Sequence, residues 1–386
     1  MDIRKIEPEE YSQVLDLRSY SFQSVYNEAK LDDFLHWLSE GHAIGCFEDR
    51  ELIGQLLILP LNMTLRGENL AMGGIGFVGT YPEHRNKGVM KAIMINALEQ
   101  MKSQEQTISV LAPFSTSFYR YFGWELFQEQ LQFSCELSDL GADPKLMDEV
   151  KRTSFESENQ VVWTEIKHFH NTLAKSRNGM MQRSEAWWNR IKARQPDSRF
   201  AAFYENGTMV GYIRYTIQNL VFQIDDYYLL HERMEAAVFR FVQAHASSVT
   251  KVEGIVPATR YFGSTFTNPS FEKKIIQPTM FRIVDLVQFF NQVTWRPKTT
   301  FLLEIHDQFA PWNEGTYYFS PTEIKKIDGV FSETIRMSIN IFSAIIAGYW
   351  DVEELWERGI ITSRKDKMMI LKEEFANDAP FFNEYF

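Results

Sequence analysis

Apolar positions along the first 112 residues follow two periods, and together they predict a mixed α/β domain. Alternating or continuous apolar runs predict five strands, at 3–6, 43–48, 51–65, 70–78 and 108–112. Apolar residues that recur every three or four positions predict three helices, at 11–20, 31–38 and 89–101. We expect turns where Asp49-Arg50 and Arg66-Gly67-Glu68 interrupt the strands.

Further changes of pattern divide the rest of the chain. Residues 138–159 are polar and charged, which predicts a linker or the outer edge of a domain. The next segments predict strands at 161–166, 222–230 and 250–258, helices at 183–194 and 233–244, and a hairpin turn at Asn206-Gly207. From Met280 onward the pattern changes again. We therefore predict three domains of the α/β (α+β) class, at residues 1–150, 151–280 and 281–386.

A short basic loop connects the strand that ends near Gly79 to the helix that follows Gly88. Arg85, Asn86 and Lys87 stand immediately before this second glycine. A helix start leaves backbone N–H groups free, and its positive end adds to the two cationic side chains. The loop therefore predicts an anion site best suited to a pyrophosphate. The alternative is a solvated turn that binds nothing.

Composition and net charge limit the kinds of molecule that the protein is expected to bind. The chain has 386 residues, of which 45% are hydrophobic, so it can bury two or three sizeable cores. The net charge of -11 argues against a nucleic-acid partner and favours a cationic small molecule or peptide, although acidity can serve solubility alone.

Cysteine usage and apolar run lengths indicate the compartment. Cys46 and Cys135 form neither a CxxC pair nor a Cys/His cluster, so we expect no metal and no disulfide. The N-terminus is charged from its second residue and does not read as a signal peptide. No run approaches eighteen apolar residues, so we expect a cytoplasmic protein with no membrane span.

The basic loop also resembles a known cofactor motif. Arg85-Asn86-Lys87-Gly88, after Val78-Gly79-Thr80, is similar to the acetyl-CoA signature of the GNAT superfamily of N-acetyltransferases, Arg/Gln-x-x-Gly-x-Gly/Ala. Met90 departs from the last position of that pattern, and a bulky aliphatic residue there resembles the enhanced intracellular survival (Eis) branch. The resemblance implies acetyl-CoA as co-substrate, with the loop on the pyrophosphate and the backbone of Val78 and Thr80 along the pantetheine arm.

An aromatic segment after the strand at 108–112 carries a second resemblance. The run Phe118-Tyr119-Arg120-Tyr121-Phe122-Gly123-Trp124 resembles the Tyr-x-x-Phe-Gly-aromatic segment of the Eis family. By this resemblance Tyr119 is the catalytic acid. A phenol with an ordinary pKa of about 10 can hold a proton at neutral pH and release it to a departing CoA thiolate. The alternative is that Tyr119 and Tyr121 only pack.

The last eight residues, 379–386, are rich in aromatic side chains to the final position, whereas a solvated terminus is normally polar. This composition predicts a buried terminus. The Eis resemblance implies that Phe386 inserts into the acetyltransferase cleft, where its carboxylate is the catalytic base. With a pKa of about 3.3–3.7, such a carboxylate works better by holding a substrate ammonium, or through a water. Docking for stability alone is the alternative.

Three further residues are candidates for binding a cationic substrate. Asp32 and Trp37 lie on one predicted helix and could form an acidic, aromatic wall, and Glu384 adds negative charge from the tail. An acid near the start of a helix can also serve only to compensate the helix dipole.

The resemblance covers nearly the whole chain. It implies tandem acetyltransferase (GNAT) folds, the second degenerate and without a cofactor site, followed by a sterol-carrier-protein-like α+β domain. It also implies a hexamer that acetylates primary amines of aminoglycosides or other polyamines, or lysine side chains of peptides. The acceptor amine stays open. A lipid or sterol carrier with inactive acetyltransferase folds is the alternative, which the basic loop argues against.

Overall fold

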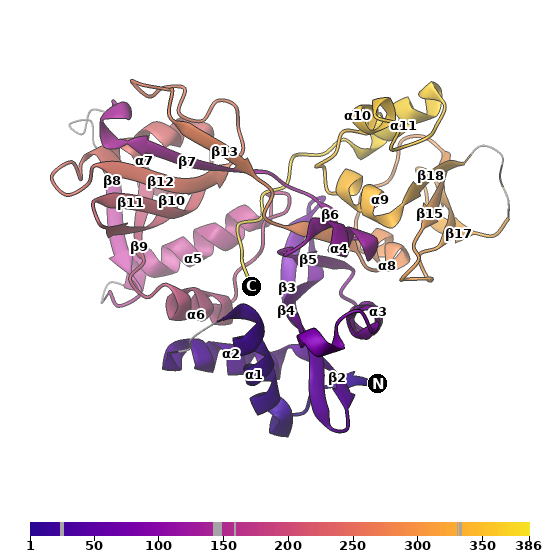
Figure 1. Ribbon diagram of the computed structural model, residues 1–386. Helices are drawn as coiled ribbons and strands as arrows, with labels where there is room; N and C mark the ends of the chain where they lie inside the picture. Colours follow the sequence, from indigo (N-terminus) through magenta and orange to yellow (C-terminus); the bar gives the residue numbers. More distant parts are fainter. Residues whose placement is uncertain (24–26, 142–148, 158–159, 330, 332–333) are drawn as a thin grey trace. The chain divides into compact units, whose positions relative to one another are not determined.

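The computed structural model describes residues 1–23, 27–141, 149–157, 160–329, 331 and 334–386 (Figure 1). The chain divides into two compact units. The first contains Met1–Gln128, Arg177–Met181 and Thr279–Phe386, and the second contains Glu129–Ser176 and Gln182–Pro278. The first unit therefore joins the two ends of the sequence and holds every residue predicted for the site.

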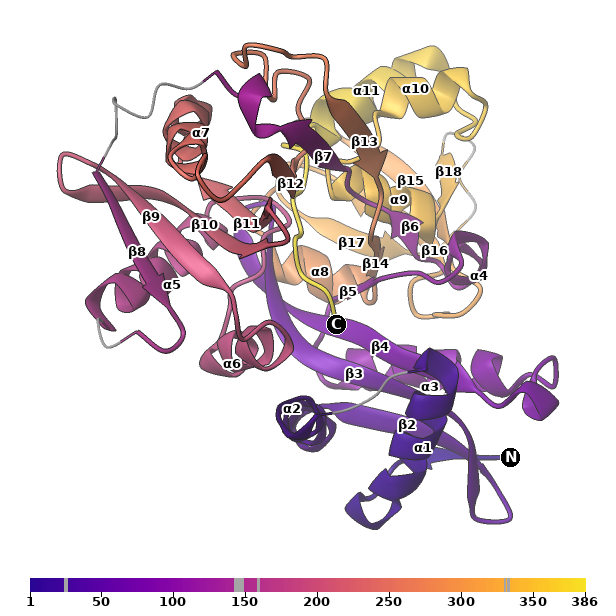
Figure 2. The same cartoon turned by 60° about the vertical axis from the view of Figure 1, so that its left-hand side comes forward.

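A seven-stranded sheet in the order β1-β2-β3-β4-β5-β14-β6 forms the centre of the first unit. Its strands are β1 (Asp2–Lys5), β2 (His42–Glu48), β3 (Glu51–Leu65), β4 (Glu68–Thr80), β5 (Ile108–Leu111), β14 (Met280–Ile283) and β6 (Glu125–Leu126). The helices nearest in sequence are α1 (Tyr11–Phe22), α2 (Glu28–Glu40), α3 (Val89–Ser103) and α4 (Thr116–Tyr121). Strands β2, β3 and β4 lie side by side and antiparallel, and β5 runs parallel to β4 (Figure 2). The predicted order of elements over the first 112 residues is confirmed.

Helix α3 packs on strand β3 through one apolar face. The buried residues of this face recur at helical spacing, namely Val89, Ile93, Met94, Ala97, Leu98 and Met101. Gly54 allows the close approach, because a Cβ built there would lie 2.8 Å from Val89 Cγ1. Gly54 also pairs with Thr80 in the sheet. The start of α3 therefore lies beside the C-terminal end of β4.

Strand β14 enters the first sheet from far along the sequence. Met280 pairs with Leu111 of β5 and with Leu126 of β6. The next arginine, Arg282, is fully buried, and its Nη2 lies 2.5 Å from Asp307 Oδ2. Because no local pattern encodes a pairing between residues more than 150 positions apart, the sequence did not indicate that this strand lies between β5 and β6 in the first sheet.

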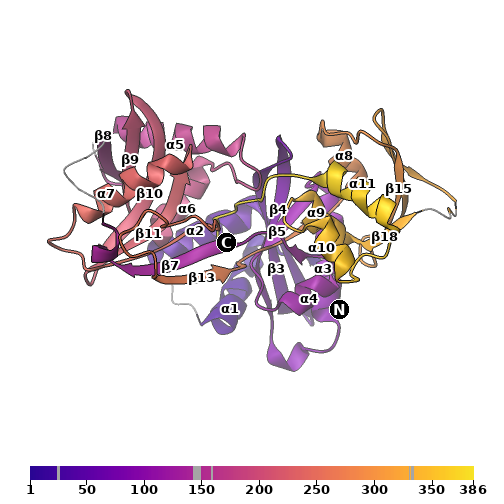
Figure 3. The ribbon, with the colours of Figure 1, turned by 90° about the horizontal axis from the view of Figure 1, so that it is seen from above.

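A four-stranded sheet, β17-β16-β15-β18, belongs to the same unit. Its strands are β15 (Phe301–His306), β16 (Gly315–Phe319), β17 (Ile324–Ile327) and β18 (Ile335–Ser338), and the helices beside it in sequence are α8 (Leu286–Gln292), α9 (Ile339–Ile346), α10 (Val352–Glu357) and α11 (Lys365–Phe375). Aromatic rings pack its interior: Phe301 stacks on Phe319 at 4.7 Å, and the Phe375 ring lies 5.9 and 6.1 Å from them. Residues 376–386, which we call the C-terminal arm, follow α11 without regular structure (Figure 3).

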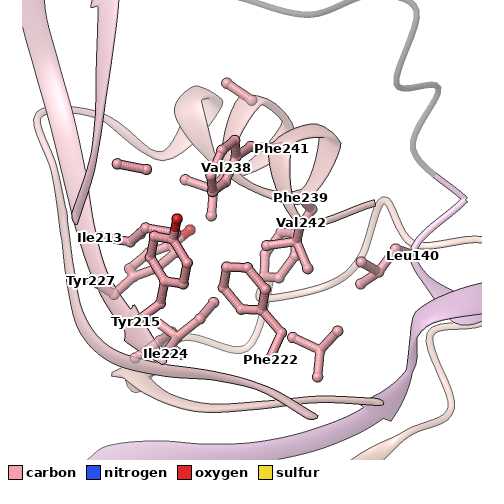
Figure 4. Packing of buried hydrophobic residues seen from close by; sticks show 14 of the residues in the cluster. Leu140, Ile213, Tyr215, Phe222, Ile224, Tyr227, Val238, Phe239, Phe241 and Val242 are labelled. Atoms are coloured by element: carbon pink, nitrogen blue, oxygen red, sulfur yellow. The ribbon is translucent and has the colours of Figure 1, made fainter. Parts of the chain in front are cut away.

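The second unit contains a separate seven-stranded sheet, in the order β13-β7-β12-β11-β10-β9-β8. Its strands are β7 (Gln130–Glu136), β8 (Glu149–Ser154), β9 (Arg199–Glu205), β10 (Thr208–Gln218), β11 (Val221–Leu229), β12 (Lys251–Pro257) and β13 (Glu272–Ile276), and its helices are α5 (Gln160–Ala174), α6 (Glu185–Arg194) and α7 (Glu235–Gln243). Phe222, Ile224 and Val242 belong to the core between these strands and α7 (Figure 4).

One predicted strand of the second unit is wrong. Residues 161–166 lie in helix α5, whose buried positions include Val162, Ile166, His170 and Leu173. These positions repeat every three or four residues, which is the helical period. The short window with its two adjacent valines favoured a strand because it did not extend over two helical turns.

The other local predictions for the second unit agree with the structure. Asn206 and Gly207 have φ values of 51° and 75°, as a two-residue turn between antiparallel strands requires. Part of the polar segment 138–159 forms β8, the edge strand of the sheet. Residues 142–148 and 158–159 of that segment lie outside the described residues.

Candidate active site

The basic loop ends at an open helix N-terminus. Gly88 is the N-cap of α3 with a φ of 81°, and Asn86 has a φ of 59°. An L-residue rarely adopts the Gly88 conformation, so glycine is needed for the backbone, although a Cβ there would meet nothing within 4 Å. No side chain caps this helix start. Its first N–H groups and its positive end are therefore available to an anion.

A cavity of about 790 Å³ lies at this helix start. It is lined by Val78, Thr80, Arg85, Asn86 and Gly88, which are five of the six residues predicted to bind the cofactor. The sixth predicted residue, Lys87, is exposed and does not line the cavity. Arg85 Nε donates to the carbonyl of Thr80 at 3.3 Å, which ties the loop to the end of β4. The volume is of the size usual for a small-molecule or cofactor site.

Strand β4 carries a bulge where it borders the cavity. Phe77 and Val78 together face the single residue Leu56 of β3. Phe77 has a φ of 56°, which is uncommon for a residue other than glycine. A bulge takes backbone groups out of the regular ladder, so the N–H of Val78 becomes a candidate donor toward the cavity.

Tyr119 lies one side chain behind the cavity wall. Ser115 Oγ accepts the N–H of Phe118 and starts α4, which buries Tyr119 to 2% exposure. The Tyr119 ring lies 5.3 Å from that of Phe114 and 5.0 Å from that of Phe118, and both of these rings line the cavity. Burial raises the pKa of the Tyr119 phenol above its ordinary value, because water cannot solvate the phenolate. The phenol therefore stays protonated at neutral pH.

Tyr121, two residues further on, contributes directly to the cavity wall. Its side chain is 54% exposed, and its ring centroid lies 4.9 Å from that of Phe309. The sequence motif favoured Tyr119 as the acid, and that role stays a prediction. Tyr121 is the second tyrosine that a test of the acid must include.

The C-terminal residue sits on strand β4. Phe386 is 8% exposed, as the aromatic tail predicted. A Cβ built on Gly76 would lie 3.5 Å from the carboxyl carbon of Phe386, and one built on Gly74 would lie 3.0 Å from its ring. These two glycines are on one face of the strand. The run of small residues in β4 therefore leaves the space that the terminal phenylalanine fills.

The side chain of Gln128 holds the backbone of the segment just before this terminus. Gln128 Nε2 donates to the carbonyl of Phe382 at 2.6 Å, and the Phe382 N–H donates to Gln128 Oε1 at 2.7 Å. The rings of Phe382 and Phe386 meet edge to face at 6.2 Å. A buried side-chain amide that pairs with both polar groups of one residue fixes the register of the arm.

The three predicted substrate residues are in different environments. Asp32 is exposed on α2, whereas Trp37 on the same helix is 3% exposed and donates its Nε1–H to Asp33 at 3.0 Å. The structure therefore does not place Trp37 beside Asp32 as an open wall, because positions five apart point to different faces of a helix. Glu384 is 7% exposed within the arm.

Sequence reasoning missed several residues that line the cavity. Lys91, in the first turn of α3, adds a cation, and its Nζ lies 5.6 Å from the centroid of the Phe309 ring. Ser21, Phe22 and His84 also line the cavity. A cation in the first turn of the helix after a glycine loop was a usable signal for Lys91. His84 directly precedes Arg85 and is part of the basic loop itself. Ser21 and Phe22 come from the end of α1, whose nearness to the loop is decided only by folding.

Metal-binding clusters and membrane-spanning helices are both absent from the described residues. No group of three or more His, Cys, Asp or Glu side chains in the described part of the chain is placed to hold a metal ion. Within the same residues, none of the helices combines the length and apolar character that crossing a membrane requires.

Family models match three successive parts of the chain. Residues 2–127 and 179–283 each match an acetyltransferase (GNAT) domain, and residues 286–383 match a sterol carrier protein domain. The chain is therefore an N-acetyltransferase of the GNAT superfamily. The predicted fold class, tandem GNAT folds followed by a sterol-carrier-like domain, is confirmed.

Known proteins have sequences or structures similar to this chain over most of its length. An uncharacterized N-acetyltransferase from Streptomyces avermitilis is 22% identical over 343 residues, which cover 82% of this chain and 81% of the relative. A probable N-acyltransferase from Enterococcus faecalis V583 has a similar structure, with a TM-score of 0.89 and 26% identity over 100% of this chain and 99% of that one. Eis1 from Mycobacterium abscessus matches with a TM-score of 0.82 and 16% identity over 100% of both chains. Over its full length the chain therefore has the same fold as Eis1.

Proposed function

We propose that the first domain transfers the acetyl group of acetyl-CoA to a primary amine of a cationic substrate. An aminoglycoside or another polyamine is the first candidate, and a lysine-bearing peptide is the second. The observation that carries this proposal is the Phe386 carboxylate on Gly76, two residues before Val78 on the strand that lines the cavity. A carboxylate in a partly enclosed site attracts an ammonium group and discriminates against anionic substrates.

The residues of the loop fit the pyrophosphate of acetyl-CoA. Arg85, Asn86 and the N–H groups after Gly88 surround the open helix start, and Lys87 and Lys91 add positive charge near it. Acetyl-CoA supplies an activated acetyl thioester whose leaving group is a thiolate. In this proposal the backbone of β4 at Val78 and Thr80 lies along the pantetheine arm.

Five groups of this chain then take four separate roles. The Phe386 carboxylate holds the substrate ammonium or accepts its proton through a water, since its ordinary pKa of about 3.3–3.7 makes it a weak base. The N–H of Val78 stabilises the negative charge that develops on the acetyl oxygen. Tyr119 keeps its proton at neutral pH and donates it to the departing sulfur. Glu384 and Asp32 add negative charge for a polycation.

The second GNAT domain differs at the corresponding helix start. Helix α7 begins with Glu235, and Glu232 stands in the turn before it. Both positions hold acidic side chains where the first domain has cations, and an ionised carboxylate beside a helix N-terminus repels a pyrophosphate. This supports the proposal that only the first domain binds acetyl-CoA. The boundaries at residues 150 and 280, the hexameric assembly and the cytoplasmic location stay predictions.

The proposal is tested by CoA-thiol release from acetyl-CoA with a multi-amine aminoglycoside, using untagged protein that ends at Phe386. We expect turnover above background hydrolysis. The matched variant carries one alanine after Phe386, which moves the carboxylate by one residue. It should bind acetyl-CoA normally but turn over at least about tenfold more slowly. Equal turnover by both proteins contradicts the role of the carboxylate. Acetyl-CoA binding without turnover on any amine, including lysine peptides, contradicts the function.

A further inference from the structure

Arg66, at the tip of the β3–β4 hairpin, has an environment unlike that of a surface turn residue. It is the first residue of a two-residue turn, with a φ of 51°, and Gly67 follows with a φ of 82°. The side chain is half-buried, and burial lowers the pKa of its guanidinium to about 10. Within the described part of the chain no carboxylate forms an ion pair with Arg66, so its partners must be of another kind.

The guanidinium of Arg66 caps two helices at once. Its Nε donates to the carbonyl of Ile346, the last residue of α9, at 3.0 Å. Its Nη2 donates to the carbonyl of Phe375, the last residue of α11, at 2.8 Å. The last carbonyls of a helix lack intrahelical partners and carry the negative end of the dipole, so a cation there is favourable. The guanidinium also lies 4.9 Å from the centre of the Trp295 ring.

Asn178 extends this junction into the C-terminal arm. Its Nδ2 donates to the carbonyls of Ala347 and Asp378, both at 2.7 Å, and its Oδ1 accepts the backbone N–H of Arg66 at 3.3 Å. Its own carbonyl accepts the N–H of Phe381 at 3.1 Å. The hairpin tip and Asn178 together hold the chain from Phe375, just before the arm, to Phe381 at about its midpoint.

The length of the arm explains why this remote junction matters at the site. Strand β4 carries the chain about 33 Å from Arg66 to Gly76, at 3.3 Å per residue. The eleven residues after Phe375 can span at most about 36–40 Å when fully extended. The arm therefore has only about one or two residues of slack between Phe375 and the strand position on which Phe386 sits.

We propose that Arg66 is a positioning residue for the acetyltransferase reaction, an inference that rests on the function proposed above. By clamping the C-terminal ends of α9 and α11 to the β3–β4 hairpin, Arg66 fixes the point from which the C-terminal arm starts. The arm then delivers the Phe386 carboxylate to Gly76. In this proposal the third domain holds the start of the arm, so that the chain terminus reaches strand β4 of the first domain.

The test compares Arg66→Met with Arg336→Met in the full-length protein. Methionine keeps apolar contact with Trp295 but removes the charge and the donors. Arg336 is an exposed arginine of β18 paired with Glu304, so it controls for the loss of one arginine. For Arg66→Met we expect kcat to fall roughly ten- to hundredfold while the Kd for acetyl-CoA stays within about twofold, because the cavity is untouched. Arg336→Met should behave as wild type.

A second measurement does not depend on turnover. Carboxypeptidase A removes C-terminal aromatic residues, and intact-mass spectrometry follows the loss of Phe386. Arg66→Met should release Phe386 roughly tenfold faster than wild type, since two charge-assisted hydrogen bonds no longer hold the start of the arm. This result supports the anchor even if the wild-type protein turns over no amine, so failure of the anchor and failure of the proposed function are distinguishable.

The remaining outcomes overturn the proposal. Unchanged kcat and unchanged release of Phe386 in folded Arg66→Met would show that the junction does not position the arm. A parallel fall in kcat, acetyl-CoA affinity and melting temperature would show a general structural role only.

If Arg66→Met does not fold, Arg66→Lys takes its place, because lysine keeps the charge but cannot donate to both carbonyls at once as the forked guanidinium does. Arg66→Lys should shift release and kcat in the same directions by a smaller factor, and no shift in a folded protein contradicts the proposal.

Discussion

The carboxyl carbon of Phe386 lies 3.5 Å from the position that a Cβ would occupy on Gly76. The last residue of the chain therefore rests on a strand more than 300 positions earlier in the sequence, and Val78 of the same strand lines the cavity at the start of α3. A small residue at this position leaves room for the carboxylate beside β4. This relationship is the basis of the first prediction.

Gly76→Val should slow the reaction without weakening acetyl-CoA binding. The valine methyl groups would occupy the place of the carboxylate, so we expect kcat to fall about tenfold or more, with the acetyl-CoA KM within about twofold. Gly76→Ala is the matched control, because its Cβ would meet the carboxyl carbon at an ordinary contact distance. Steady-state kinetics with a polyamine substrate measures both. If Gly76→Val retains full kcat, the carboxylate takes no part in the reaction.

The two cations of the basic loop should differ in their effect on acetyl-CoA binding. Arg85 lines the cavity, whereas Lys87 is exposed and does not. Arg85→Glu replaces an attractive contact with repulsion and should weaken acetyl-CoA binding at least about tenfold in a calorimetric titration. Lys87→Glu makes the same change in charge and should weaken it by roughly two- to threefold, through long-range attraction alone. Equal losses would show that the loop acts only through its net charge.

Removing the hydroxyl of each tyrosine identifies the acid. We expect Tyr119→Phe to lower kcat about a hundredfold with little change in the acetyl-CoA KM, and Tyr121→Phe to change kcat by less than about threefold. Burial raises the pKa of Tyr119, so its proton stays in place as the pH rises. The wild-type rate should accordingly show no loss attributable to this group below about pH 10. The opposite ranking of the two variants would assign the role to Tyr121.

Glu235 should make the second unit less stable as the pH rises. Burial raises the pKa of its carboxyl from 4.5 to about 7, while its Oε1 accepts the N–H of Gly263 at 3.2 Å. Because the folded pKa is above the unfolded one, the stabilising contribution is complete below pH 4.5 and is lost as the pH rises through about 7. Glu235→Gln keeps an oxygen acceptor and cannot ionise.

Urea denaturation at several pH values checks this prediction. The Glu235→Gln variant should exceed the wild type in free energy of unfolding at pH 8 and match it near pH 4.5. Glu99→Gln, at an exposed position of α3, serves as the control and should leave the pH profile unchanged. A constant difference between Glu235→Gln and wild type across the whole range would mean that the carboxyl does not titrate in that window.

Local patterns predicted most of the first domain. The helix after Gly88 and the strands from His42 to Thr80 followed from apolar spacing and turn residues, because each element buries one face of its own sequence. The same reasoning failed at 161–166, where six residues were too few to separate the helical period from a strand. It also gave no sign that Met280–Ile283 joins the first sheet, since strand pairing across the chain leaves no local signature.

The sequence by itself determined the basic glycine loop, the aromatic tail and the two candidate tyrosines, because residue type and short spacing encode charge, backbone freedom and hydrophobicity. Only the tertiary structure decided that Tyr121 lines the cavity while Tyr119 lies behind it, that Phe386 rests on Gly76, and that Arg66 caps two helices. Each of these relationships depends on which side chains folding brings together from distant segments or turns toward the cavity. Their physical basis is the packing of complementary surfaces, which no single stretch of sequence contains.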